Sequence, residues 1–350
     1  ASSCTVDGRT AGGLVGSNWH SGSHNYGAIT ACIYTGIAAN PVEGDSHYSN
    51  STDVYYKDEN GVWKSYPGNV AADETALLQK VNAYIAKNGG TFILSGDGTT
   101  YPTSAVSYLD HTENGFVTKY AETYTEINSE NLPTTWNDGW YVVGGTVAID
   151  SRVTVTGDVK LILKDGANLI VNGGISVPSG SAFTVYGQQD GTGNLTSNGT
   201  NGTAGIGGTA DNVNFGTIVL AAKGKITATG DIRAAGIGAG AGIGGSYNAS
   251  GGSITITGGF VEAGSIGGGS AENGGPGGTI IISGGIVTAD RIGAGGDNQE
   301  GSFSTTSQGN AVIFAGSISD QSGKNTNAWS GLIFEGNDGK IYGTGYTVDE

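Results

Sequence analysis

Several residue types are scarce in this chain of 350 residues, and each shortage excludes a class of protein. Only 6 prolines occur and no Gly-X-Y triplet rule is present, so the chain is not a collagen. No run of about 18 apolar residues exists, so no membrane insertion is expected within this chain. Methionine is absent and only 13% of the residues are charged, which leaves glycine, small polar residues and short apolar runs to determine the fold.

Basic residues are also few. The 15 Lys and Arg stand against 31 Asp and Glu, which gives a formal net charge of −16. A surface of this sign repels the phosphate backbone of nucleic acids and the headgroups of anionic membranes. The sequence therefore predicts no nucleic-acid partner.

Cysteine occurs twice, as Cys4 and Cys32, within one N-terminal segment. We expect a disulfide between them, because an oxidising compartment would pair the two thiols and close a short loop. Closing that loop contributes roughly 3–4 kcal/mol in the chain-entropy model. Two buried thiols are the alternative.

Glycine is the abundant residue, with 66 copies against a usual share of about 7%. Hydrophobic residues still make up 37% of the chain, mostly in short runs of Ile, Val, Leu and Ala. This is enough to build a continuous core, so the glycines do not indicate disorder. We expect them at the turns between short strands, where positive φ is needed.

The N-terminal part divides into a glycine-rich β segment over residues 1–40 and an α+β region over 41–135. In the second, "DVYYKDENGVWKSYP" (53–67) alternates around Asn60 and Gly61, the dipeptide of a tight hairpin turn. Residues 70–88 predict one helix, because five apolar residues fall on one helical face: Leu77, Leu78, Val81, Tyr84 and Ile85.

From residue 136 onward the chain is a series of short alternating strands that break at glycine. The stretch "SITITGG" (253–259) returns as "TIIISGG" (279–285), 26 residues later. Four such repeats align, with leading apolar runs in 216–230, 252–264, 278–290 and 310–320. The spacing predicts an all-β fold, a parallel β-helix or β-solenoid over 136–350. A right-handed coil is the expectation from the rule for parallel crossovers.

In such a coil the inward residues of one turn stack on those of the next. Ile254 and Ile256 should meet Ile280 and Ile282 at about 4.8 Å, the spacing between paired strands. The glycine pairs that follow these strands should occupy corners with positive φ. Isoleucines next to glycine should each place one apolar side chain inside the coil: Ile206, Ile237, Ile243, Ile266 and Ile292.

Two stretches resemble known families. The N-terminal "GGLVGSN" (12–18) and "YGAITACIYTG" (26–36) resemble the GLUG motif of bacterial extracellular proteins, with Ala31 where Asn is common. The segment 140–295 resembles the glycine-rich β-helical repeats of adhesin-like surface proteins of anaerobic bacteria. These resemblances imply secretion and display at the bacterial cell surface, and they imply less about biochemical activity.

Catalysis and metal binding are not expected. Pectin-hydrolase-like β-helices carry a histidine on their turns, whereas no histidine follows His111 here. A glycosidase needs two carboxyl groups at a defined separation, and nothing in the repeats fixes such a pair. No cofactor is predicted. The stretches "SGDGTTYP" (95–102) and "KDGANL" (164–169) leave calcium as a weak alternative, because they lack the alternating Asp ladder of a calcium loop.

Aromatic residues gather near the N-terminus and at the start of the coil. Exposed Trp and Tyr rings stack on the apolar faces of sugars, and the leading candidates for glycan stacking are Tyr56, Trp63 and Trp19. The alternative is that the aromatic residues pack the N-terminal region and cap the first turn of the coil. The residues at that cap would be Trp136, Trp140 and Tyr141.

The sequence leaves three functions open. The first is a non-enzymatic, extracellular bacterial surface protein, adhesin-like, whose stiff solenoid binds a glycan or another host or microbial surface ligand. The second is a structural subunit of a self-assembling extracellular filament, in which the N-terminal segment adds a strand to another copy. Its assembly residues would be Leu14, Val15, Ile29 and Ile33. The third, a polysaccharide lyase or hydrolase, is suggested by the fold alone.

Overall fold

The chain divides into two compact units, Ala1–Ala105 and Val106–Glu350. In the first, the computed structural model describes residues 30–34, 52–57, 63–66, five positions between 78 and 86, 91–95 and 99–105. In the second it describes 106–293 apart from 113–114, 210–213, 222, 230–240, 246–251 and 270–277, and then short strands between 304 and 347.

The first unit contains two small sheets. In one, β1 (Thr30–Tyr34) pairs in parallel with β2 (Thr52–Lys57). β2 also pairs antiparallel with β3 (Trp63–Tyr66), the two strands expected as a hairpin. In the other sheet, β4 (Phe92–Leu94) and β5 (Thr100–Pro102) pair antiparallel.

The described part of the predicted helix over 70–88 consists of residues 78, 79, 82, 83 and 86, and all five are helical. Asn82 joins this segment to β4. Its Nδ2 donates to the Leu94 carbonyl at 2.9 Å, and its Oδ1 accepts from the Leu94 N–H at 2.8 Å. The side chain thereby satisfies two backbone groups of a short strand.

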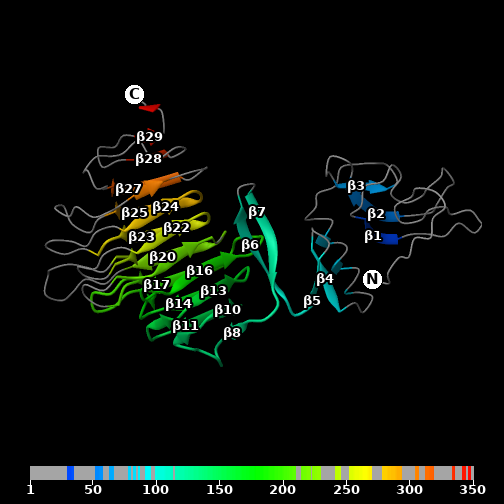
Figure 1. Ribbon diagram of the computed structural model, residues 1–350, viewed down its shortest axis with the longest axis horizontal. Coiled ribbons are helices and arrows are strands. Elements are labelled where there is room, and N and C mark those ends of the chain that lie inside the picture. Colours follow the sequence, from blue (N-terminus) through cyan, green and yellow to red (C-terminus); the bar gives the residue numbers. More distant parts are fainter. Residues whose placement is uncertain are drawn as a thin grey trace, which may run out of the picture. The chain divides into compact units, whose positions relative to one another are not determined.

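The second unit is an all-β, solenoid-like coil in which each turn adds strands to three faces (Figure 1). We number the faces 1 to 3 and call one turn a rung. Face 1 is a sheet of eight parallel strands: β8 (Thr125–Ile127), β10 (Gly139–Val143), β13 (Asp158–Leu163), β16 (Ala182–Gly187), β19 (Thr217–Leu220), β22 (Ser253–Ile256), β24 (Thr279–Ile282) and β26 (Ser304–Thr306).

Faces 2 and 3 belong to one larger sheet. Face 2 begins with β11 (Thr146–Ile149), β14 (Asn168–Val171), β17 (Asn194–Asn198) and β20 (Lys225–Thr229). Face 3 begins with β9 (Thr135–Trp136), β12 (Val153–Val155), β15 (Ile175–Ser176), β18 (Ile206–Gly207) and β21 (Ile243–Gly244). Three longer strands then run through both faces: β23 (Phe260–Gly267), β25 (Ile286–Gly293) and β27 (Val312–Ile318).

The parallel coil is followed by antiparallel strands. β28 (Ile333–Glu335) continues the parallel pairing from β27. β29 (Ile341–Gly343) pairs antiparallel with β28, and β30 (Tyr346–Thr347) pairs antiparallel with β29. The strands therefore keep one direction up to β28 and alternate in direction from β28 to β30.

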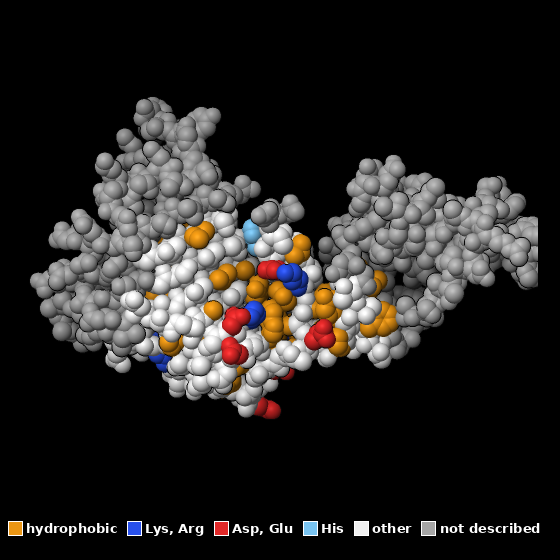
Figure 2. Space-filling model, viewed as in Figure 1, with side chains coloured by type: hydrophobic (Ala, Val, Ile, Leu, Met, Phe, Trp, Pro, Cys, Tyr) orange, Lys and Arg blue, Asp and Glu red, His pale blue; other side chains and the backbone are white. Residues whose placement is uncertain are grey.

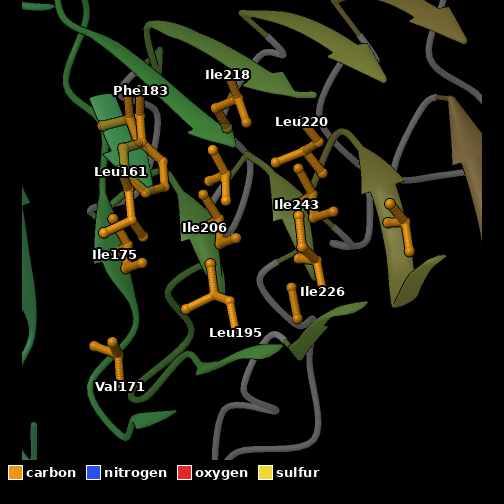
Figure 3. Close-up of a cluster of buried hydrophobic side chains, with 14 of the residues drawn as sticks. Leu161, Val171, Ile175, Phe183, Leu195, Ile206, Ile218, Leu220, Ile226 and Ile243 are labelled. Atoms are coloured by element: carbon orange, nitrogen blue, oxygen red, sulfur yellow. The ribbon is translucent and has the colours of Figure 1, made fainter. Parts of the chain in front are cut away.

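The interior of the coil is filled by inward side chains that stack from rung to rung, as the repeats predict (Figure 3). Ile254 lies opposite Ile280 and Ile256 opposite Ile282, and all four are at most 1% exposed. Burying one such side chain contributes roughly 1.5–3 kcal/mol. The column of Ile256 continues through face 1 on earlier rungs as Leu220, Val185 and Leu161.

The isoleucine–glycine pairs form the central ladder of face 3. Ile206, Ile243, Ile266 and Ile292 pair in that order, and each is fully buried. Ile237 lies outside the described residues. The glycine that follows each isoleucine has a positive φ, which is 134° at Gly244. A Cβ added to Gly244 would clash with the carbonyl oxygen of Gly267 on the next rung, so only glycine fits there.

One expected alignment of the repeats is wrong. The run in 310–320 does not continue face 1, because β27 pairs with β25 on faces 2 and 3. Face 1 continues with β26, which pairs with β24 and contains only Ser and Thr. Rungs on face 1 also differ in length, from 16 residues between Thr125 and Tyr141 to 36 between Thr217 and Ser253. The stacked inward side chains, and not the spacing along the chain, therefore set the register.

Trp136 closes the N-terminal end of this core. It is fully buried and stacks on Tyr141, with ring centroids 5.5 Å apart and an interplanar angle of 26°. Its Nε1 donates to the Pro133 carbonyl at 3.0 Å, which satisfies the polar atom of a buried indole. Trp136 and Tyr141 thus cap the first rungs, as one of the two sequence interpretations predicts.

Arg152 ties three successive rungs at the corner between faces 2 and 3. Its Nη1 donates to the Gly173 carbonyl (2.9 Å), Thr203 Oγ1 (2.8 Å) and the Ala204 carbonyl (3.1 Å). Its Nη2 donates to the Gly208 carbonyl at 2.8 Å. Burial lowers the pKa of Arg152 to about 10, and no carboxylate pairs with it in the described part of the coil. Carbonyl dipoles therefore take the place of a counter-ion.

We expect Arg152→Met to lower the free energy of unfolding by on the order of 2 kcal/mol, because partly buried carbonyls lose charged donors. Urea unfolding followed by circular dichroism measures the change. Lys223→Met is the matched control, since Lys223 is exposed and donates one hydrogen bond, to the Gln189 carbonyl. If the Arg152→Met chain unfolded at the same urea midpoint as the control, Arg152 would not stabilise the coil by connecting its rungs.

Candidate functional site

A hairpin covers part of the outer side of face 1. It consists of β6 (Val106–Thr112) and β7 (Gly115–Ala121), which pair antiparallel. Its inward side chains form an apolar cluster with Val142 of β10 and Ile162 of β13, both fully buried. Gln188 Nε2 donates to the Ser107 carbonyl at 2.8 Å and so fixes β6 beside the end of β16.

Three aromatic rings meet where the hairpin and the sheet join. The ring centroid of Tyr108 lies 4.6 Å from that of Trp140 and 4.7 Å from that of Tyr186. The Trp140 and Tyr186 centroids are 5.5 Å apart. Tyr108 is buried, whereas Trp140 and Tyr186 are half-buried on the outer side of face 1. We call these three residues the aromatic surface.

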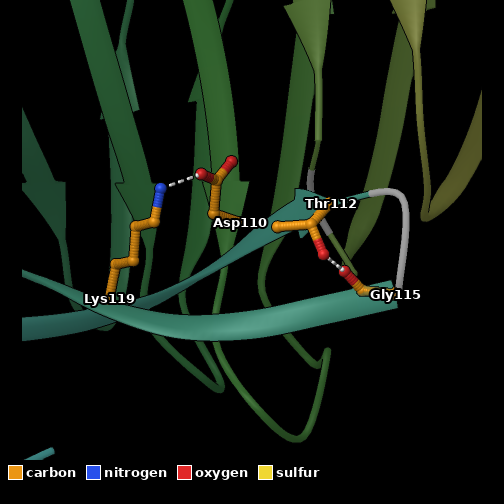
Figure 4. Close-up of polar contacts among 4 residues, drawn as sticks. All are labelled: Asp110, Thr112, Gly115 and Lys119. Carbon is orange, nitrogen blue, oxygen red and sulfur yellow. Dashed lines mark hydrogen bonds and ion pairs between the residues drawn. The ribbon is translucent and has the colours of Figure 1, made fainter. Parts of the chain in front are cut away.

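Two ion pairs flank the aromatic surface. Lys119 Nζ on β7 lies 2.6 Å from Asp110 Oδ2 on β6. Figure 4 shows this pair, with Thr112 Oγ1 donating to the Gly115 carbonyl near the hairpin tip. Lys160 on β13 pairs with Asp158, and its Nζ lies 5.7 Å from the Trp140 ring centroid, a cation–π contact. Figure 2 shows hydrophobic side chains gathered between acidic and basic ones on this side of the molecule.

The aromatic surface retains two free donors. Trp140 Nε1 and Tyr186 Oη donate to no residue in the part of the chain that the structure describes. Burial raises the pKa of Tyr186 above its ordinary value, with smaller contributions from Asp110, Tyr108 and Asp158. The hydroxyl group therefore keeps its proton at neutral pH and can donate to a ligand. Ring faces, free donors and carboxylate acceptors together match the chemistry of a sugar.

The sequence interpretation missed this site because it treated Trp140 as part of the cap. In "GWYVV" (139–143), Tyr141 and Val143 point into the core and Trp140 and Val142 point outward. Strand alternation within that stretch was the signal that could have separated Trp140 from Tyr141.

The predicted glycan-stacking residues lie in the first unit. Tyr56 pairs with Lys64, and Trp63 pairs with Lys57, so the two positions belong to opposite faces of the β2–β3 pair. Their side chains and Trp19 lie outside the described residues. The described backbone therefore places the Tyr56 and Trp63 positions on opposite faces of the pair.

The predicted disulfide and assembly residues are described only in part. Cys32 lies in β1 opposite Val54, and Cys4 lies outside the described residues. Ile33 lies opposite Tyr55, whereas Leu14, Val15 and Ile29 fall outside the described part. β1 thus has a strand partner within its own chain, and it forms one edge of the three-stranded sheet among the described strands.

The described residues of the two calcium stretches form no recognisable cation site. Asp165 accepts backbone N–H groups of Asp190 (3.1 Å) and Thr192 (3.3 Å), so its carboxylate braces a turn between rungs. Residues 96–98 of the other stretch are not described. Among the described residues, no three His, Cys, Asp or Glu side chains are close enough to hold a metal ion together.

No protein-family model, curated protein or solved structure gives a significant match to this chain. The described residues contain no helix with the length and apolar character needed to cross a membrane. The GLUG-like and adhesin-like resemblances stay predictions.

Proposed function

We propose that the chain is a non-enzymatic, extracellular bacterial surface protein, adhesin-like, whose solenoid is a rigid scaffold for glycan binding. The aromatic surface is the observation that carries this proposal. It presents Trp140 and Tyr186, each half-buried and each with a donor that bonds to no described residue, on a sheet held by stacked rungs. A site on regular strands keeps its geometry, which limits the entropy lost on binding. Secretion and surface display rest on the sequence resemblances.

The proposal predicts that Trp140→Ala weakens glycan binding by roughly tenfold or more, which corresponds to about 1.4 kcal/mol. A glycan array with the purified chain identifies a bound sugar, and titration calorimetry then measures the variants. Phe260→Ala is the matched control, because Phe260 is an aromatic residue 48% exposed on face 2, away from the hairpin.

A second pair of variants guards against misfolding. Trp140→Phe keeps an aromatic ring and should retain part of the affinity, and Tyr186→Phe removes only the hydroxyl donor. Thermal unfolding of each variant checks that the coil is intact. Equal weakening by Trp140→Ala and Phe260→Ala would argue against the aromatic surface, and a wild-type chain that binds no glycan would argue against the function.

The second candidate is a filament subunit, and one observation favours it. β1 lies at the edge of its sheet among the described strands, so its outer backbone groups offer a template for a strand from another copy. Light scattering after size-exclusion chromatography measures the mass of the particles and so distinguishes the two functions. A 35.0 kDa monomer argues for the adhesin-like function. High-mass species that disappear when residues 1–40 are deleted argue for the filament.

A further inference from the structure

Past β13, whose outward Asp158 and Lys160 form an ion pair, the outer side of face 1 forms a strip without charges. Beyond β13, the outward side chains at the middle of successive strands are Thr184, Val219, Thr255 and Ile281. The outward residues beside them are also uncharged: Ala182, Thr217, Ser253 and Thr279. We call these eight residues the neutral strip. Thr184 is buried, at 8% exposed, and the other seven are half-buried or exposed.

The strip is aligned with the aromatic surface by strand register. Trp140 lies opposite Lys160, Lys160 opposite Thr184, and the same column then runs through Val219, Thr255 and Ile281. Paired strands are about 4.8 Å apart, so five steps span about 24 Å along the coil. Each step is close to the advance of one sugar unit in an extended polysaccharide chain.

The outward residues of face 1 are uncharged on β16, β19, β22 and β24, whereas other parts of the coil carry charges. On face 2, Lys225 Nζ pairs with Glu262 Oε2 at 2.9 Å across neighbouring rungs, and Phe260 is 48% exposed. Asp290 is exposed on β25. In a chain of net charge −16, an outer strip of small hydroxyl and aliphatic side chains avoids the desolvation cost of covering ionised groups.

We infer that the ligand is a neutral, extended glycan that lies along the coil, with one sugar on Trp140 and following sugars over the neutral strip. This inference rests on the proposed glycan-binding function. Thr and Ser hydroxyls can exchange hydrogen bonds with sugar hydroxyls, while Val219 and Ile281 contact the apolar C–H groups. Asp110 and Asp158 beside the aromatic surface are each paired with a lysine, so these four groups add no net positive charge that would select an acidic polysaccharide.

The test uses neutral cello- and manno-oligosaccharides of increasing length, with acidic oligogalacturonides as the comparison. We expect affinity for the matching neutral series to rise with length until the strip is covered. Thr255→Arg places a long side chain across the strip, far from Trp140, and should weaken the long oligosaccharide roughly tenfold while leaving the disaccharide unchanged. Thr227→Arg is the matched control, an outward half-buried threonine on face 2.

Each outcome has a distinct meaning. If Trp140→Ala abolishes binding but length and Thr255→Arg have no effect, the extended ligand is wrong and the proposed function stands. Tighter binding of oligogalacturonides would overturn the neutral ligand. If the wild-type chain binds no glycan, both the proposed function and the inference of a neutral, extended ligand fail. A dimer that Thr255→Arg separates would show that the strip contacts a second copy, which would also overturn the inference.

Discussion

A chain with Gly244→Ala should lose much of its stability, about 2–6 kcal/mol. Gly244 has a φ of 134°, and holding a residue with a Cβ in such a conformation costs about 1–3 kcal/mol. The new Cβ would also clash with the Gly267 carbonyl of the next rung, and overpacking of this kind adds about 1–3 kcal/mol. The midpoint of urea unfolding, followed by circular dichroism, measures the loss.

Gly264→Ala is the matched control for this substitution. Gly264 lies in β23, has no positive φ, and a Cβ there would meet no atom within 4 Å. Alanine at this position should leave the midpoint unchanged or raise it slightly, because it lowers the entropy of the unfolded chain. If the two variants behaved alike, the glycine ladder of face 3 would not be a close backbone contact.

Trp136→Ala should lower the free energy of unfolding by about 3–5 kcal/mol, the usual cost of removing a fully buried large aromatic side chain. Trp136 stacks on Tyr141 and lies 5.9 Å from the Phe183 ring centroid, so its loss would open a cavity at the first rungs. Calorimetric and denaturant unfolding both report the change.

A nearby position provides the comparison for Trp136. Leu132 precedes the same strand and is 42% exposed, so Leu132→Ala should change stability by less than about 0.5 kcal/mol. Trp136→Phe should fall between the two, because phenylalanine fills part of the space and removes the hydrogen bond to Pro133. A Trp136→Ala chain as stable as Leu132→Ala would mean that the aromatic cap is dispensable.

The repeats reveal the coil from the sequence alone because the same side chains must stack on one another. "SITI" and "TIII" carry isoleucine at matching positions, and the structure pairs Ile254 with Ile280. The predicted alignment of 310–320 is wrong, because β26 carries only Ser and Thr on face 1 and the next apolar run belongs to β27. An alignment based on apolar runs cannot identify a polar strand whose register is set by its neighbour.

The candidate site was harder to predict than the fold because it depends on two segments far apart in sequence. Tyr108 reaches Trp140 and Tyr186 only after the β6–β7 hairpin folds onto the outer side of face 1. Nothing local to "AVSYLDH" (105–111) specifies which surface the hairpin will cover. Strand alternation could have identified Trp140 as an outward residue, but not the tyrosines beside it.

The unequal lengths of the rungs have an evolutionary consequence. One turn can grow from 20 to 35 residues while Tyr141, Leu161, Val185 and Leu220 stay in one column, because the added residues lie between the paired strands. Insertions and deletions at the corners leave the pairing register of the strands unchanged. Homologous chains could therefore diverge quickly in their corner loops while inward positions change slowly, and a foreign peptide grafted into a corner should be tolerated where one placed inside a strand is not.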